Sequence, residues 1–265
     1  MSFIVIIPAR YSSSRLPGKP LVDIGGKPMI QRVYELAKKS KADDIYIATD
    51  HNDIIDCCSS FGAKALMTNS QHPSGTDRIA ETSELLNLLP NTVVINVQGD
   101  EPFLNFLDID TLADFFIQEK RFDLCTLYSD FTSQQDISDP NLVKLWLDKN
   151  NTVKAFSRRE DFIEESQFLR ALHIGIYIYK VDFIKQFVSW TQSINEKKEN
   201  LEQLRAIDKG KKIGAIKSLS KEQLSRLKLI HGDSQIKSTQ KVDSVIAMNF
   251  SYWVFKERDA LKKYF

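Results

Sequence analysis

The chain has 265 residues, and its 36 Lys and Arg against 35 Asp and Glu give a formal net charge of +1, which does not indicate a nucleic-acid-binding protein. No apolar run reaches the ~20 residues of a membrane-spanning helix, and the N-terminus lacks a charged leader and a small-residue cleavage site. The three cysteines form no C-x-x-C pair, so we expect reduced thiols in a cytoplasmic protein with no nucleic-acid or membrane partner.

Short apolar runs alternate with amphipathic segments through the first half of the chain. The expected strands are residues 3–7, 44–49, 63–68, 92–97 and 124–128, and the expected helices are residues 29–37, 53–60, 76–89 and 109–118. Such alternation is typical of a parallel sheet with helices on both faces. We therefore expect an α/β fold with three layers around a mostly parallel, twisted sheet.

The pattern changes from Asn141 onwards. Apolar runs at 142–147 and 152–156 flank D-K-N-N, which predicts a β-hairpin; a strand is expected at 173–179 and a charged helix at 195–209. Because no Pro- or Gly-rich linker separates two cores, we interpret residues 1–265 as a single domain with a β-rich excursion at 141–172. Residues 218–265 show the least regular pattern and form an atypical C-terminal tail.

Three cations follow the first expected strand within ten residues. Arg10, Arg15 and Lys19 lie in P-A-R-Y-S-S-S-R-L-P-G-K-P. Ligands of parallel α/β sheets bind at the carboxyl ends of the strands, which places these cations at the binding edge. Arg offers paired planar donors and Lys a point charge, so together they suit a polyphosphate. The loop is neither a Walker A nor a G-x-G-x-x-G sequence, and a solvated basic loop is the alternative.

Two further polar motifs are expected at the same edge. Q-G-D-E-P closes the fourth expected strand, and its Asp100 is a candidate ligand for a divalent cation that bridges phosphate oxygens. H-P-S-G-T-D-R, residues 72–78, leads into a helix whose free N–H groups can bind an anion or a base edge. Taken singly, these motifs are also explained by turn formation and by helix capping.

Together, the three motifs resemble the signature blocks of the 3-deoxy-manno-octulosonate cytidylyltransferase family, the CMP-Kdo synthetases. The similarity continues through N-L-V-K, F-S-R, H-I-G-I-Y and L-E-Q-L-R-A and covers residues 3–215. Family members transfer CMP from CTP to the acid sugar Kdo and release pyrophosphate, for lipopolysaccharide biosynthesis. The resemblance implies a nucleotide-diphospho-sugar transferase-like, Rossmann-like fold, Mg²⁺ as cofactor, and a homodimer whose contact buries Leu145 and Trp146.

The resemblance also implies roles for individual residues. Arg15, Lys19 and Asp100 would be catalytic, with Asp100 as a ligand of Mg²⁺. The nucleotide would be bound by Arg10, Ser13, Arg15, Lys19, Ser74, Gly75, Thr76, Arg78 and Gln98. The sugar would be bound by Gln98, Arg158, His173, Tyr177, Glu202 and Gln203. Taken alone, His173 also fits a packed histidine of a strand.

The tail departs from the family pattern. Members usually carry G-V-D-T-P-E-D-L after the last strand, and its first aspartate is a second metal ligand. The nearest match here is K-V-D-S, which makes Asp243 the candidate second ligand and leaves Asp233 as a poorer one. Three hypotheses follow: an active CMP-Kdo synthetase, a cytidylyltransferase for another acid sugar (8-amino-Kdo or a sialic-type acid), and an inactive homologue that binds CTP.

Overall fold

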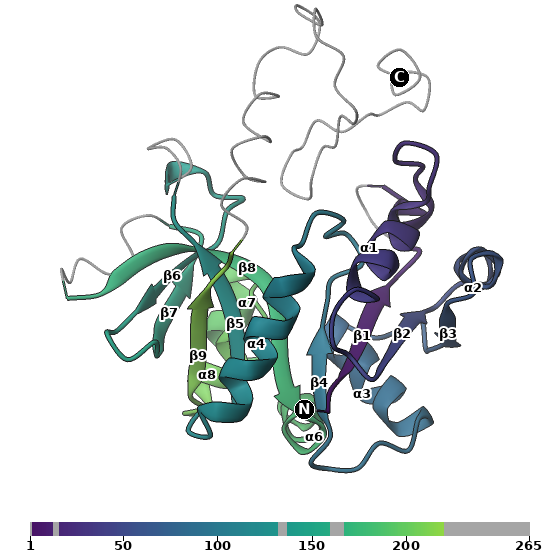
Figure 1. Ribbon diagram of the computed structural model, residues 1–265. Helices are drawn as coiled ribbons and strands as arrows, with labels where there is room; N and C mark the ends of the chain where they lie inside the picture. The colour runs from purple at the N-terminus through teal and green to yellow at the C-terminus, as the bar shows by residue number, and fades with distance from the viewer. Residues whose placement is uncertain (1, 13–15, 132–136, 160–166, 220–265) are drawn as a thin grey trace, which may run out of the picture.

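A computed structural model describes residues 2–12, 16–131, 137–159 and 167–219 (Figure 1). Its strands form a nine-stranded sheet, in which seven follow the order β3-β2-β1-β4-β8-β5-β9 and the β6–β7 hairpin pairs with β8. The strands are β1 (Ile4–Ala9), β2 (Asp44–Thr49), β3 (Lys64–Met67), β4 (Val93–Asn96), β5 (Leu124–Ser129), β6 (Lys144–Leu147), β7 (Val153–Ser157), β8 (Leu169–Lys180) and β9 (Ile213–Lys217).

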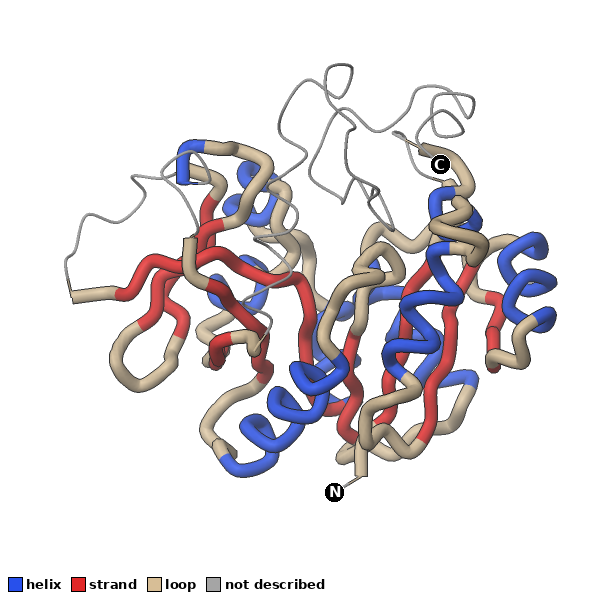
Figure 2. The backbone as a smooth tube through the Cα atoms, turned by 45° about the horizontal axis from the view of Figure 1, so that its top comes forward, coloured by secondary structure: helices blue, strands red, loops and turns tan. Residues whose placement is uncertain are grey.

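The seven-strand part of the sheet is parallel except at β8, which runs antiparallel to both β4 and β5. The expected α/β fold with a mostly parallel sheet is thereby confirmed. The β6–β7 hairpin pairs antiparallel with the first residues of β8 and lies at one end of the molecule in both views (Figures 1 and 2).

Helices cover both faces of the sheet (Figure 2). They are the 3₁₀ helix η1 (Lys19–Leu21), α1 (Met29–Ala37), α2 (Asn52–Ser60), α3 (Gly75–Leu85), α4 (Phe106–Gln118), α6 (Val181–Ser189), α7 (Ile194–Glu199) and α8 (Leu204–Asp208). Within β1, Val5 and Ile7 belong to the core shared with α1 and α4, whereas Ile6 belongs to the core shared with α3, α6 and α8. Successive strand residues point to opposite faces, which produces these two apolar layers.

Several elements differ from the sequence-based expectations; the helix expected at 76–89, for example, ends at Leu85. The charged helix expected at 195–209 is wrong as one element, because Asn200 adopts a left-handed conformation at φ 55° that ends α7 before α8 begins. The strand expected at 173–179 starts at Leu169 because its first residues pair with β6. An unexpected helix, α6, follows β8, and its residues Val181, Ile184 and Phe187 are buried at helical spacing.

The hairpin contains two apolar side chains that were expected at a dimer contact. Leu145 is 0% exposed and Trp146 is 1% exposed within this single chain. The expectation that a partner subunit buries them is therefore wrong, because the chain's own packing already does so. The homodimer itself stays a prediction. Among the described helices, none combines the length and apolar character needed to cross a membrane.

Candidate active site

The Q-G-D-E-P loop after β4 lies directly against the end of β1. A Cβ atom built on Gly99 would come within 2.8 Å of the Pro8 carbonyl oxygen and 3.4 Å of the Ala9 Cβ atom. The first distance is shorter than real Cβ atoms allow, so a side chain at position 99 would force the backbone of β1 to move. Glycine therefore allows the loop after β4 to approach the start of the basic loop after β1.

Lys19 and Asp100 meet at this edge. The Lys19 Nζ atom lies 2.7 Å from the Asp100 Oδ2 atom, and their side chains are 22% and 27% exposed. Lys19 begins η1 directly after Gly18, whose φ of 68° favours glycine. The next acidic residue is Glu101, and desolvation together with the neighbouring Asp100 carboxylate raises its pKa to about 8, against the opposite effect of Lys19. A partly exposed cation and carboxylate thus lie side by side where the sequence predicted a ligand edge.

The start of α3 supplies backbone donors near the same edge. Ser74 is the N-cap residue: its Oγ atom accepts a hydrogen bond from the Asp77 N–H at 3.3 Å and lies 2.6 Å from Asp77 Oδ2. Gly75 opens the helix against the Pro8 side chain, which a Cβ would meet at 3.6 Å, an ordinary contact. The first turn of a helix carries unsatisfied N–H groups and a partial positive charge, which suit an anionic ligand.

Thr76 connects this turn to a distant part of the chain. Its Oγ1 atom donates a hydrogen bond to Glu202 Oε1 at 2.9 Å. Burial is the main effect that raises the pKa of Glu202. Gln203 follows at the start of α8 and is 4% exposed. The structure thus brings one residue predicted to bind the nucleotide into contact with one predicted to bind the sugar.

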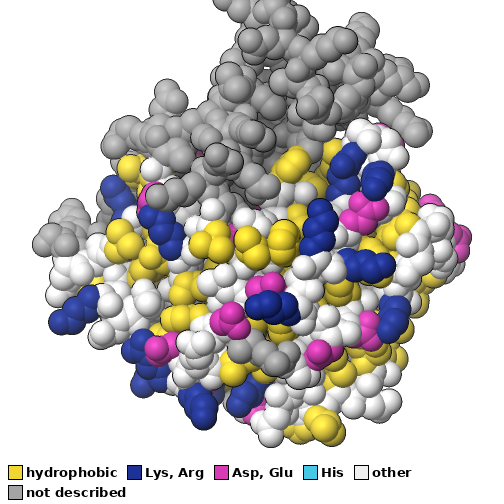
Figure 3. Space-filling view, in the orientation of Figure 1, with side chains coloured by type: hydrophobic (Ala, Val, Ile, Leu, Met, Phe, Trp, Pro, Cys, Tyr) yellow, Lys and Arg dark blue, Asp and Glu magenta, His cyan; other side chains and the backbone are white. Residues whose placement is uncertain are grey.

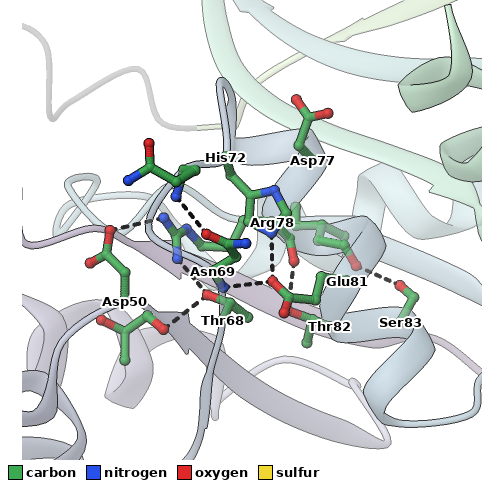
Figure 4. A network of polar contacts seen from close by, with 12 residues as sticks. Asp50, Thr68, Asn69, His72, Asp77, Arg78, Glu81, Thr82 and Ser83 are labelled. Carbon is green, nitrogen blue, oxygen red and sulfur yellow. Dashed lines mark hydrogen bonds and ion pairs between the residues drawn. The ribbon is translucent and has the colours of Figure 1, made fainter.

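Arg78 is held by the protein's own acceptors (Figure 4). Its guanidinium donates to Asp50 Oδ2 at 3.0 Å and to the Thr68 hydroxyl, and the residue is 3% exposed. Burial lowers the pKa of Arg78, while the Asp50 carboxylate opposes that shift. Our sequence analysis missed Asp50 and Thr68. The signal for Asp50 was its place directly after the second strand, at the same edge as the basic loop.

His173 and Tyr177 lie on β8. The His173 Nε2 atom is 3.0 Å from Thr126 Oγ1, and the imidazole centroid lies 5.5 Å from that of the Tyr177 ring. Desolvation lowers the pKa of His173 to about 3. The imidazole is therefore neutral at physiological pH and offers a hydrogen-bonding group rather than the fixed cation that a sugar carboxylate requires.

Arg158 directly follows β7, at the end of the hairpin. Its guanidinium donates to the backbone carbonyls of Pro140, Asn141 and Glu199 at 3.1 to 3.3 Å. It therefore ties the segment before β6 to the end of α7. Gln98 lies after β4, and its Nε2 atom donates to Asn96 Oδ1 at 3.2 Å.

Comparisons with known proteins place this site in a family. The family model described as Cytidylyltransferase matches residues 4–213. The 3-deoxy-manno-octulosonate cytidylyltransferase of Francisella tularensis subsp. novicida (strain U112) is 47% identical over 219 residues, which are 79% of this chain and 87% of that protein. The chain belongs to the 3-deoxy-manno-octulosonate cytidylyltransferase family.

Two further relatives are similar over a comparable share of the chain. The enzyme named 3-deoxy-manno-octulosonate cytidylyltransferase 2 of Actinobacillus pleuropneumoniae serotype 5b (strain L20) is 42% identical over 226 residues, covering 80% of this chain and 88% of its own length. A solved structure of CMP:2-keto-3-deoxy-manno-octonic acid synthetase complexed with CTP superposes with a TM-score of 0.75 at 37% identity. It covers 82% of this chain and 89% of its own. Fold and sequence therefore agree on the cytidylyltransferase family.

Four residues that were predicted for the cytidylyltransferase site have not yet been placed. Arg10 is exposed where the basic loop leaves β1. Ser13, Arg15 and Asp243 lie outside the described residues. Their roles stay predictions.

Proposed function

We propose that the chain transfers CMP from CTP to Kdo, giving CMP-Kdo and pyrophosphate. An anomeric hydroxyl oxygen of the sugar forms the new bond to the α-phosphorus, the bond from that phosphorus to pyrophosphate breaks, and the hydroxyl proton leaves to solvent. The observation that carries the proposal is the contact of Lys19 with Asp100 at 2.7 Å. It joins a cation and a carboxylate at the carboxyl edge of the parallel strands in a chain of this family.

The basic loop supplies the electrostatic part of this reaction. Negative charge develops on the leaving pyrophosphate, and a cation fixed beside it stabilises the transition state more than the ground state. Lys19 is held at the edge by η1, and exposed Arg10 stands at the other end of the loop. The N–H groups in the first turn of α3 add donors for an anionic group of the nucleotide.

Mg²⁺ fits this edge as a shared ligand of protein and nucleotide. Asp100 offers a partly exposed carboxylate, and Mg²⁺ sites of this kind usually combine one or two carboxylates with substrate phosphates. Within the described ranges, no three His, Cys, Asp or Glu side chains are grouped to hold a metal. Asp100 would therefore hold Mg²⁺ together with the phosphates of CTP, where the ion neutralises phosphate charge. Asp243 remains the candidate second ligand.

The acid sugar would lie beyond the start of α3. Glu202 carries an acceptor for a sugar hydroxyl, and Gln203 an amide that both donates and accepts. Neutral His173, beside Tyr177, would contribute hydrogen bonds without charge. The contact of Thr76 with Glu202 supports a shared wall between the nucleotide and the sugar.

One assay tests the proposal against its alternatives. The protein is incubated with CTP, Mg²⁺ and Kdo, 8-amino-Kdo or N-acetylneuraminate, and both pyrophosphate release and the CMP-sugar are measured. We expect turnover with Kdo and its loss in Asp100→Asn, whereas Asp56→Asn, a change on the exposed face of α2, should behave as the parent. Turnover with one of the other two sugars and none with Kdo would change the assigned substrate to that sugar. CTP binding without any turnover would identify an inactive homologue.

A further inference from the structure

Asp50 connects two segments of the candidate site that are far apart in the sequence. It directly follows β2, and its two carboxylate oxygens accept from different elements. Oδ1 accepts the Tyr11 backbone N–H at 2.8 Å, and Oδ2 accepts the Arg78 Nη2 donor at 3.0 Å. The Asp50 side chain is 5% exposed and that of Arg78 is 4% exposed. This buried carboxylate therefore holds both the basic loop and the first turn of α3.

Tyr11 is the point at which the basic loop is closed. Its carbonyl oxygen accepts the Gly18 N–H at 2.9 Å, so both backbone polar groups of Tyr11 are engaged. Its ring stacks on the His51 ring, with centroids 3.8 Å apart and an interplanar angle of 16°. A Cβ built on Gly18 would lie 3.4 Å from the Tyr11 ring. Residues 50 and 51 thus fix Tyr11 at the base of the loop. Tyr11 in turn binds Gly18, the residue directly before Lys19.

The Arg78 side of the connection is equally well supported (Figure 4). The Thr68 hydroxyl accepts a hydrogen bond from the Arg78 guanidinium and donates one to the Thr49 carbonyl at 2.9 Å. Arg78 follows the N-cap Ser74 by four positions, so its anchoring sets where the free N–H groups of α3 point. Removing one partner of a buried ion pair leaves an uncompensated charge, and the remaining group then moves or draws in water.

We propose that Asp50 is a positioning residue for the phosphates of the nucleoside triphosphate. It does not reach the ligand itself; it holds Lys19 against Asp100 through Tyr11, and it holds the start of α3 through Arg78. This inference rests on the proposed function. It predicts that Asp50 matters more for a nucleoside triphosphate than for the monophosphate, because the basic loop faces the leaving phosphates.

The test compares binding of CTP with binding of CMP. Asp50→Asn keeps the size of the side chain and an acceptor for the Tyr11 N–H but removes the charge opposite Arg78. We expect the Kd for CTP to rise by about tenfold or more, as for other small displacements of positioning groups, and the Kd for CMP to change by less than about threefold. Steady-state kinetics should show a raised KM for CTP as well as a lower kcat.

Asp110→Asn is the matched control. Asp110 is 8% exposed and accepts the Lys41 N–H at 2.8 Å, before the start of β2 and thus away from the carboxyl edge. Loss of folded protein weakens CTP and CMP binding by the same factor, so it cannot change their ratio. Asp110→Asn should therefore lower the midpoint temperature of thermal unfolding. It should leave the ratio of the Kd for CTP to the Kd for CMP as in the parent.

A second variant covers the case in which Asp50→Asn fails to fold. His51→Asn keeps a good N-cap residue for α2 and removes the ring that stacks on Tyr11. It should lower the preference for CTP over CMP in the same direction. If the parent is active and the folded Asp50 or His51 variant still prefers CTP to CMP as strongly as the parent does, the positioning role of Asp50 is overturned. The proposed function is not affected by that result. A parent that neither prefers CTP to CMP nor turns over overturns the proposed function as well.

Discussion

The Thr76 hydroxyl donates a hydrogen bond to the Glu202 carboxylate at 2.9 Å, although 126 positions separate the two residues. Thr76 lies in the first turn of α3, and Glu202 lies between α7 and α8. Buried surroundings strengthen such a hydrogen bond and make its loss costly. The sides of the site that we propose to bind the nucleotide and the sugar are therefore expected to be energetically coupled.

A double-mutant cycle measures that coupling. Thr76→Val removes the hydroxyl donor, Glu202→Leu removes the carboxylate acceptor, and each should lower kcat/KM for the acid sugar. Because the two side chains share one contact, we expect a coupling energy of about 0.5–3 kcal/mol between the two changes. Thr76→Ser keeps the donor and should stay close to the parent. Strictly additive effects would show that the contact has no functional weight.

The α/β framework was predictable because its signals are local. The helix Met29–Ala37 and the strand Asp44–Thr49 have the bounds that the sequence pattern indicates. In the helix, the buried residues Met29, Ile30, Val33, Tyr34 and Ala37 follow helical spacing. The prediction of one helix at 195–209 was wrong because of a single residue, Asn200, whose left-handed backbone conformation cannot be read from hydrophobic periodicity.

The candidate site was predictable only in part. The strand-end rule was enough to bring Lys19 near Asp100, since it needs only the order of strands and loops. It did not reveal that Arg78 lies on Asp50, because that contact depends on which residues of neighbouring elements face each other. The neutral state of His173 follows from its desolvation, which the residue type alone does not give.

Gly99 offers a test of the close approach between β4 and β1. In Gly99→Ala the new Cβ would lie 2.8 Å from the Pro8 carbonyl oxygen. We expect a loss of about 1–3 kcal/mol in the free energy of unfolding, measured by urea denaturation, because backbone must shift to make room. Gly175→Ala is the control, since nothing lies within 4 Å of its built Cβ. Equal stability of both variants would contradict the tight contact.

Glu101 gives a prediction about pH. Its pKa is about 8 in the folded protein against the ordinary 4.5, so between these values the folded protein binds a proton that the unfolded chain has lost. The free energy of unfolding should therefore fall as pH rises from about 4.5 to about 8. Glu101→Gln cannot ionise, and it should be more stable relative to the parent at pH 8.5 than at pH 5.

Thermal denaturation at the two pH values measures this difference. Glu84→Gln, a change on the exposed surface of α3, serves as the control and should show the same small effect at both pH values. Basic and acidic side chains are interspersed over the face seen in Figure 3, so a single exposed substitution changes the overall field little. A parent-like pH profile of Glu101→Gln would mean that Glu101 ionises normally.

Lys19→Ala tests the electrostatic role of the basic loop. The Lys19–Asp100 pair is partly exposed, so its loss should change the free energy of unfolding by less than about 1 kcal/mol. The rate should fall on the order of 10²–10³-fold, because a cation beside the developing negative charge is removed. Arg15→Ala, at a position outside the described residues, should lower the rate in the same way.

Lys64→Ala is the matched control for Lys19→Ala. Lys64 also pairs with an aspartate, Asp44, at 2.5 Å, but both residues begin their strands and so lie at the edge opposite to Lys19. Its loss should leave pyrophosphate release from CTP and Kdo unchanged. A decrease of less than about threefold in both Lys19→Ala and Arg15→Ala, with both proteins folded, would mean that the loop is a solvated basic surface. A decrease in Lys64→Ala as large as that in Lys19→Ala would mean that losing any lysine–aspartate pair slows the reaction. The position of Lys19 beside the leaving group would then not be the cause.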